Sequence, residues 1–163
     1  MMKNLVIALV QMESVVGKID TNLSKIKKYI DDATFHKVDI ICFPELSITG
    51  YSPKNSPEYA EMIPGYSSKI LSQWAKEKQI TILSGICEKN HNLNPYITHV
   101  VCMANGNIFT YRKTHLAPHE LSFFTPGDEL PIFEIPQVRF AIEICWELHF
   151  PQLTTFLSLQ GAE

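Results

Sequence analysis

Glu45, Lys113 and Cys145 are the side chains of this sequence whose types and places could do chemistry. Each closely follows an apolar run of the kind that forms a buried strand, and open α/β sheets build their ligand sites beyond the carboxyl ends of such strands. A thiol becomes a good nucleophile when a carboxylate takes its proton, and an ammonium group can stabilise developing negative charge. Each residue also has a purely structural explanation. Glu45 could be a solvated loop acid, Lys113 an ordinary basic residue after a hairpin, and Cys145 a small buried side chain.

The elements that must position these side chains alternate between strands and helices. The sequence predicts strands over residues 5–10, 38–43, 80–86, 98–103, 108–111, 132–135 and 138–144, and helices around 22–30, 70–75 and 151–160. Thr21 or Asn22 is expected to cap the first helix, and Asn105-Gly106 suits a type I′ hairpin turn. A βαβαβ start followed by hairpins predicts an α/β fold, with a mixed sheet covered by helices in a single domain over residues 1–163.

Composition points to a small-molecule partner. The chain has 163 residues, 45% of them hydrophobic, and its 14 basic and 17 acidic side chains give a net charge of -3. There is no basic stripe, so nothing favours nucleic acid. The apolar run 5–10 ends at Gln11, before it reaches the length of a signal-peptide core or a membrane span, which predicts a cytoplasmic protein without a membrane partner. The four cysteines form no CxxC pair and no cluster with histidines, so we expect reduced thiols and no metal site.

Three segments of the sequence resemble the signature regions of the nitrilase superfamily, the carbon-nitrogen hydrolases. They are Phe43-Pro44-Glu45-Leu46 with Thr49-Gly50-Tyr51, Tyr111-Arg112-Lys113-Thr114-His115-Leu116, and Ile144-Cys145-Trp146-Glu147-Leu148-His149-Phe150-Pro151. Supporting matches are Gln11, Asn105-Gly106, Thr125-Pro126-Gly127 and Gly161-Ala162-Glu163. Their order and separations also match, so the resemblance covers the whole chain.

The resemblance implies a role for each reactive side chain. Glu45 is the general base, Lys113 the cation that stabilises the oxyanion and Cys145 the nucleophile, while Glu120 stands where many members keep a second glutamate that supports the site. These roles suit amide hydrolysis, because Glu45 can take the thiol proton and later return one to the departing ammonia. The charge of Lys113 also lowers the thiol pKa. The intermediate is an acyl-thioester, which needs no cofactor and no metal.

Other residues near these segments have less direct roles. The resemblance implies that Trp146 offers its backbone N–H to the oxyanion and that Tyr51 belongs with the oxyanion and substrate-binding residues. His115, His119 and His149 are alternative bases for the thiol. No histidine lies in a segment that resembles the families with a Cys and His pair, which favours the glutamate.

The resemblance implies an αββα sandwich of the carbon-nitrogen hydrolase type. Because members of the superfamily are usually longer, we expect the sandwich to be incomplete, with its C-terminal part missing. The pattern agrees, since a strand followed by the helix at 151–160 is the first part of a crossover unit that normally returns to a parallel strand. A terminal helix docked on the sheet is the alternative. Intact relatives suggest a homo-oligomer.

The implied function is hydrolysis of a non-peptide carbon-nitrogen bond in a small linear amide or N-carbamoyl acid, with release of ammonia. Three alternatives stay open: nitrile hydrolysis, acyl transfer to an acceptor other than water, and an inactive remnant that serves as a binding or assembly module. Specificity depends on loops such as 52–64 and 117–125, whose shape the sequence does not reveal.

Overall fold

The computed structural model of the chain describes residues 4–91 and 93–163. One mixed sheet contains, in spatial order, β1 (Ile7–Leu9), β2 (Ile40–Cys42), β3 (Thr81–Glu88), β4 (Tyr96–Cys102) and β5 (Ile108–Arg112). β1, β2 and β3 are parallel, whereas β4 is antiparallel to both β3 and β5, so β5 points the same way as β2. A separate antiparallel hairpin consists of β6 (Phe133–Ile135) and β7 (Val138–Phe140).

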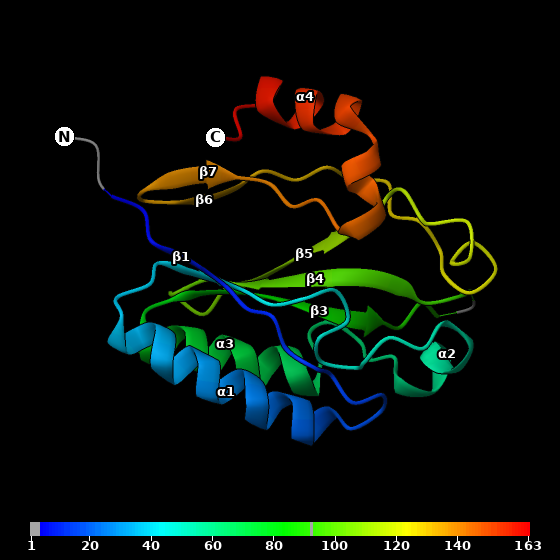
Figure 1. Cartoon of the computed structure of the whole chain (residues 1–163), viewed down its shortest axis with the longest axis horizontal. Coiled ribbons are helices and arrows are strands. Elements are labelled where there is room, and N and C mark those ends of the chain that lie inside the picture. Colours follow the sequence, from blue (N-terminus) through cyan, green and yellow to red (C-terminus); the bar gives the residue numbers. More distant parts are fainter. Residues whose placement is uncertain (1–3, 92) are drawn as a thin grey trace.

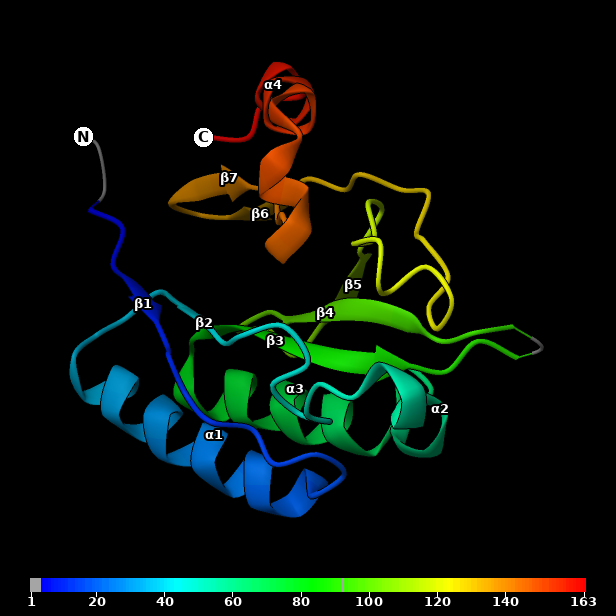
Figure 2. The ribbon, with the colours of Figure 1, turned by 45° about the vertical axis from the view of Figure 1, so that its right-hand side comes forward.

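The helices complete a layered structure. They are α1 (Ile19–Phe35), α2 (Ser56–Tyr59), α3 (Tyr66–Lys78) and α4 (Pro151–Leu159), with the short 3₁₀ helices η1 (Pro53–Asn55) and η2 (Cys145–His149). Figure 1 shows α1 and α3 against one face of the mixed sheet, the β6–β7 hairpin over the other face and α4 outside the hairpin, and the turned view of Figure 2 keeps this order. The layers follow one another as α, β, β and α, which confirms the predicted sandwich.

Two apolar layers hold the sandwich together. On the helix side, Ile30 of α1 and Leu71 of α3 are packed in one cluster with Ile82, and all three are fully buried. On the hairpin side, Leu83 belongs to a second cluster with Phe133. Ile82 and Leu83 are neighbours on β3 that serve different layers, because successive side chains of a strand point to opposite faces. β3 is therefore buried along its whole length, including its polar residues Thr81, Ser84 and Glu88.

The first helix begins earlier than the sequence suggested. Lys18 is the N-cap of α1, so the expectation that Thr21 or Asn22 caps this helix is wrong. Asn22 is instead fully buried, and its amide nitrogen donates to the Val15 carbonyl at 2.8 Å and to the Ile48 carbonyl at 2.9 Å. A hydrogen bond to the loop after β2 thus replaces the local capping bond that Asn often makes.

The turn between β4 and β5 also differs from the expectation. The N–H of Gly106 donates to the Met103 carbonyl at 2.8 Å, which closes the turn. Gly106 has a positive φ of 89°, whereas Asn105 does not. A type I′ turn is therefore wrong, because that turn requires positive φ at both central residues.

The strand expected over residues 138–144 is shorter in the structure, since β7 ends at Phe140. The backbone N–H of Ile144 donates to the Glu147 carboxylate at 2.7 Å instead of to a neighbouring strand. The chain has therefore left the hairpin before it enters η2 at Cys145.

Candidate active site

Glu45 lies in the sharp turn that follows β2. The turn is held against β3, because the N–H of Ile48 donates to the Gly85 carbonyl at 2.9 Å. Gly85 permits this approach, since a β-carbon there would lie 2.6 Å from the Pro44 carbonyl oxygen. Leu46 has a φ of 50°, in the left-handed region that non-glycine residues rarely adopt. Glu45 is thus positioned where the sequence predicted it, beyond the carboxyl end of β2.

Lys113 comes directly after β5, and its side chain is fully buried. Its N–H donates to the Ile97 carbonyl at 2.8 Å, and its own carbonyl accepts from the Gly127 N–H at 2.8 Å. The ammonium group donates to Glu45 Oε1 at 2.7 Å and to the two oxygens of Glu120 at 2.9 and 3.1 Å. A buried ammonium group needs such partners, because an unpaired charge away from water is costly. Three of the predicted site residues therefore meet here.

Glu120 connects the ammonium group to the edge of the site. Its side chain is almost completely buried, and Oε2 accepts from the Ala117 N–H at 2.7 Å. Oε1 accepts from the Tyr51 hydroxyl at 3.0 Å, and the same hydroxyl lies 2.9 Å from Nε2 of His119. Tyr51 is 41% exposed, so the network that begins at buried Lys113 reaches the surface at this residue.

Cys145 is the first residue of η2, and its side chain is exposed. Its φ of 50° is a strained conformation for a residue with a β-carbon, of the kind that gathers at active sites. Trp146 follows half-buried, with its ring 4.4 Å from that of His149. Because it is near the start of a helix, the Trp146 N–H is one of those that a helix leaves without an internal partner. Figure 1 shows this short helix, just before α4, beside the end of β5.

The charges of the buried network act on the nucleophile. Partial shielding from water raises the pKa of the Cys145 thiol, the negative charge of Glu45 raises it further, and Lys113 opposes both without reversing them. Lys113 therefore lowers the thiol pKa as expected, but the net shift of that pKa is upward. The thiol stays protonated until a base takes its proton. Burial also raises the pKa of Glu45, against the opposing effect of Lys113. A carboxylate with a raised pKa is a better proton acceptor.

Lys113 itself stays charged. Burial acts to lower the pKa of Lys113, but the hydrogen bonds and negative charges of Glu45 and Glu120 outweigh burial and raise it. The site therefore combines a fixed cation, a base and a protonated thiol.

The other cysteines differ from Cys145. Cys87 and Cys102 are buried, and burial raises the pKa of each thiol to about 12. Cys42 is half-buried, and burial raises its pKa too. All four are free thiols. Within residues 4–91 and 93–163, no three His, Cys, Asp or Glu side chains gather where they could hold a metal ion. In the same ranges, no helix has both the length and the apolar character to cross a membrane.

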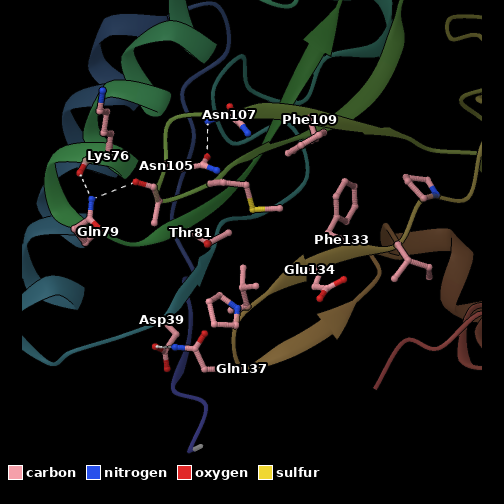
Figure 3. A pocket seen from close by; sticks show the side chains of 16 residues that line it. Asp39, Lys76, Gln79, Thr81, Asn105, Asn107, Phe109, Phe133, Glu134 and Gln137 are labelled. Carbon is pink, nitrogen blue, oxygen red and sulfur yellow. Dashed lines mark hydrogen bonds between the residues drawn. The ribbon is translucent and has the colours of Figure 1, made fainter.

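A groove of about 960 Å³ lies away from these residues. Figure 3 shows Asp39, Gln79 and Glu134 around it together with the rings of Phe109 and Phe133. Its walls come from the beginnings of β2 and β3, the β4–β5 turn and the hairpin, whereas the candidate site lies beyond the carboxyl ends of β2 and β5. None of the predicted site residues lines this groove.

His99 was not among the residues that the sequence singled out. It is buried in β4, where its Nε2 donates to the Phe43 carbonyl at 3.1 Å. Burial lowers the pKa of His99, so the imidazole is neutral. It therefore supports the segment that leads to Glu45. The signal that could have found it is its place within the apolar run of a strand buried on both faces.

Comparisons with known proteins agree with this geometry. Residues 6–163 match the family model described as carbon-nitrogen hydrolase. The chain is 32% identical over 152 residues to the omega-amidase NIT2 of Xenopus tropicalis, covering 87% of this chain and 55% of that protein. It is 33% identical over 162 residues to a nitrilase of Pyrococcus abyssi, covering 96% of this chain and 62% of that protein.

Solved structures show the same fold. The NitN amidase from Neterenkonia sp. AN1 superposes with a TM-score of 0.89 at 20% identity, covering 98% of this chain and 64% of that one. Saccharomyces cerevisiae Nit3 superposes with a TM-score of 0.88 at 24% identity, covering 97% of this chain and 61% of that one. The chain spans 55% of the omega-amidase and 62% of the nitrilase. Because the family model matches from residue 6 to residue 163, the chain belongs to the carbon-nitrogen hydrolase family.

Proposed function

We propose that this chain carries the active site of an amidase-type hydrolase, which cleaves a carbon-nitrogen bond in a small linear amide or N-carbamoyl acid. The observation that supports the proposal is the buried Lys113 ammonium group, which contacts both Glu45 and Glu120. The charges of all three residues act on the exposed Cys145 thiol. A base, a cation and a thiol are the groups that acyl transfer to a cysteine requires.

In the first half of the reaction, Glu45 takes the thiol proton while Cys145 Sγ attacks the carbonyl carbon. Negative charge develops on the carbonyl oxygen, where the Lys113 ammonium group and the Trp146 N–H stabilise it. One such donor typically contributes about 3 kcal/mol to the transition state. Glu45 then gives its proton to the amide nitrogen, the carbon-nitrogen bond breaks and ammonia leaves. The acyl group remains on Cys145 as a thioester.

In the second half, Glu45 takes a proton from a water molecule while the water oxygen attacks the thioester carbon. The carbon-sulfur bond breaks, the carboxylic acid leaves and the thiol regains a proton from Glu45. Glu120 does not react in this scheme. It holds Lys113 in place and, through the Tyr51 hydroxyl, connects that cation to the partly exposed edge of the site.

The substrate class rests on the relatives. An omega-amidase is 32% identical to this chain, which favours amides. A relative named nitrilase is 33% identical, so a nitrile is the second candidate. We further propose a single domain, a cytoplasmic location and, from the resemblance alone, a homo-oligomer. Size-exclusion chromatography with light scattering measures the assembly, and imaging of the tagged protein in cells tests its location.

Ammonia release by the purified protein tests the function. We expect release from small linear amides, ω-amides or N-carbamoyl acids, its loss in Cys145→Ala and its retention in the matched control Cys102→Ala. Release from nitriles alone favours the second candidate. No release from a protein that circular dichroism shows to be folded contradicts hydrolysis and favours an inactive binding or assembly module. Retained release in Cys145→Ala overturns the choice of nucleophile.

A further inference from the structure

Glu147 is a fully buried carboxylate with an unusual set of partners. Its Oε1 accepts from the Tyr111 hydroxyl at 2.6 Å, the Thr114 hydroxyl at 2.7 Å, the Thr114 N–H at 2.8 Å and the His115 N–H at 3.2 Å. Its Oε2 accepts from the Ile144 N–H at 2.7 Å. The two oxygens of one carboxylate therefore bind two different segments of the chain.

These two segments carry the proposed cation and nucleophile. Tyr111 and Thr114 lie on either side of Lys113, and Ile144 directly precedes Cys145. Both segments are bound through backbone N–H groups, and the Lys113 segment also through the Tyr111 and Thr114 hydroxyls. Glu147 therefore restrains the path of the main chain on both sides of the site.

Glu147 also closes the turn on which Cys145 stands. Its own N–H donates to the Ile144 carbonyl at 3.1 Å, while its carboxylate accepts from the Ile144 N–H. Between these two bonds Cys145 has a φ of 50°, which a residue with a β-carbon keeps only when its surroundings hold it there.

We propose that Glu147 is a positioning residue that holds the Lys113 ammonium group in line with the Cys145 thiol. The inference rests on the proposed function, because it assigns Glu147 no contact with substrate. Lys113 and Cys145 come from separate layers of the sandwich, the mixed sheet and the segment after the hairpin. Glu147 contacts both segments directly, so its carboxylate sets the distance between cation and nucleophile.

The variant Glu147→Gln tests this role with little change in shape. A carboxylate accepts at both oxygens, whereas an amide accepts at one side and donates at the other. If the amide oxygen faces Thr114, the amide NH₂ group faces the Ile144 N–H. In the reverse orientation, the NH₂ group faces the Thr114 N–H. Either way, one of the two segments loses its bond and meets a second donor.

The readouts separate positioning from stability. We expect Glu147→Gln to lower kcat for ammonia release about 100-fold, the loss typical of a misplacement near 1 Å. KM should change little, because Glu147 does not touch substrate. Iodoacetamide alkylation of Cys145, followed against pH by peptide mass spectrometry, should move to higher pH, because a displaced Lys113 no longer lowers the thiol pKa.

Glu88→Gln is the matched control. Glu88 is also a buried carboxylate, and it accepts from Thr98 at 2.8 Å and from Arg112 at 2.6 and 2.8 Å, without contact to the Cys145 segment. Loss of the Glu88 carboxylate should lower Tm but leave the alkylation profile of Cys145 unchanged. If Glu147→Gln lowers Tm and leaves kcat and the alkylation profile as in the wild type, Glu147 only stabilises the fold and the inference is overturned.

Two milder variants cover the case in which Glu147→Gln does not fold. Tyr111→Phe and Thr114→Val each remove one hydroxyl donor and leave the carboxylate in place. Both should shift the alkylation profile in the same direction by a smaller amount, and unshifted profiles in both overturn the inference. The alkylation profile needs no turnover. If the wild-type protein releases no ammonia, the proposed function fails while the role of Glu147 is still decided by alkylation.

Discussion

The ammonium group of Lys113 lies 2.7 Å from a carboxylate oxygen of Glu45, although 68 residues separate the two in the sequence. The sheet explains this contact, because β2 and β5 point the same way, with β3 and β4 between them. Glu45 follows the end of β2 and Lys113 follows the end of β5, so the parallel direction of these strands brings base and cation to one edge. Each favours the charged form of the other.

Replacing Lys113 by Met should be costly in two ways. The fully buried cation disappears while Glu45 and Glu120 remain close together. We expect turnover to fall about 100-fold to 1,000-fold, as for the loss of an oxyanion donor. We also expect the free energy of unfolding to fall by about 3 to 5 kcal/mol, the usual cost of breaking a buried ion pair. Steady-state kinetics and urea denaturation measure the two losses.

Lys27→Met is the control for this substitution. Lys27 pairs with Asp31 at 2.6 Å on the surface of α1, and Asp31 keeps a second partner in Lys78 at 2.8 Å. An exposed pair of this kind contributes less than about 1 kcal/mol. Equal losses of stability in the two variants would contradict the importance that we give to the buried pair.

Replacing Glu45 by Gln should separate thiol acidity from catalysis. The negative charge of Glu45 raises the pKa of the Cys145 thiol, so its removal lowers that pKa. Alkylation of Cys145 by iodoacetamide at pH 7 should therefore become faster, while ammonia release is lost because no base takes or returns a proton. The pH profile of alkylation and the rate of ammonia release are measured on the same samples. Retained turnover would rule out Glu45 as the base, whereas slower alkylation would contradict the predicted effect of its charge on the thiol pKa.

The sequence predicted which segments meet, but not which polar side chains hold them together by hydrogen bonds. Apolar spacing predicted the strands that end near Glu45 and Lys113, because burial of a strand leaves a pattern in its own residues. Asn22 and Glu147 leave no such pattern, since they bond to backbone atoms of Ile48 and Thr114, 26 and 33 residues away. Asn22 was therefore predicted as a helix cap, and Glu147 could not be distinguished from its neighbours.

Gly85→Ala should disturb the site because β3 packs closely against the turn that carries Glu45. A β-carbon at residue 85 would lie 2.6 Å from the Pro44 carbonyl oxygen, so the turn that carries Glu45 must move. We expect the free energy of unfolding to fall by about 1 to 3 kcal/mol from overpacking. Turnover of the folded fraction should fall about 100-fold from misplacement of the base. Denaturation and kinetics on the same preparation measure both effects.

Gly106→Asn is the matched glycine control for Gly85→Ala. Gly106 has a φ of 89° in an open turn, where a β-carbon meets nothing nearer than 3.5 Å, and Asn tolerates positive φ better than most residues. The Gly106→Asn variant should leave turnover unchanged. If Gly85→Ala destabilises the protein yet keeps full turnover per folded molecule, the close packing of β3 does not position Glu45.

His99 should make the fold sensitive to mild acid. Burial lowers the pKa of His99 below its usual 6.5, so the unfolded chain binds a proton more readily than the folded one. Stability from this group is therefore present above about pH 6.5 and declines as the pH falls, by at most about 1.4 kcal/mol per pH unit. His99→Gln, whose amide can still donate to the Phe43 carbonyl, should reduce the loss of unfolding free energy between pH 7 and pH 5. The control His91→Gln alters an exposed loop residue, and an equal reduction there would show that His99 is not the group responsible.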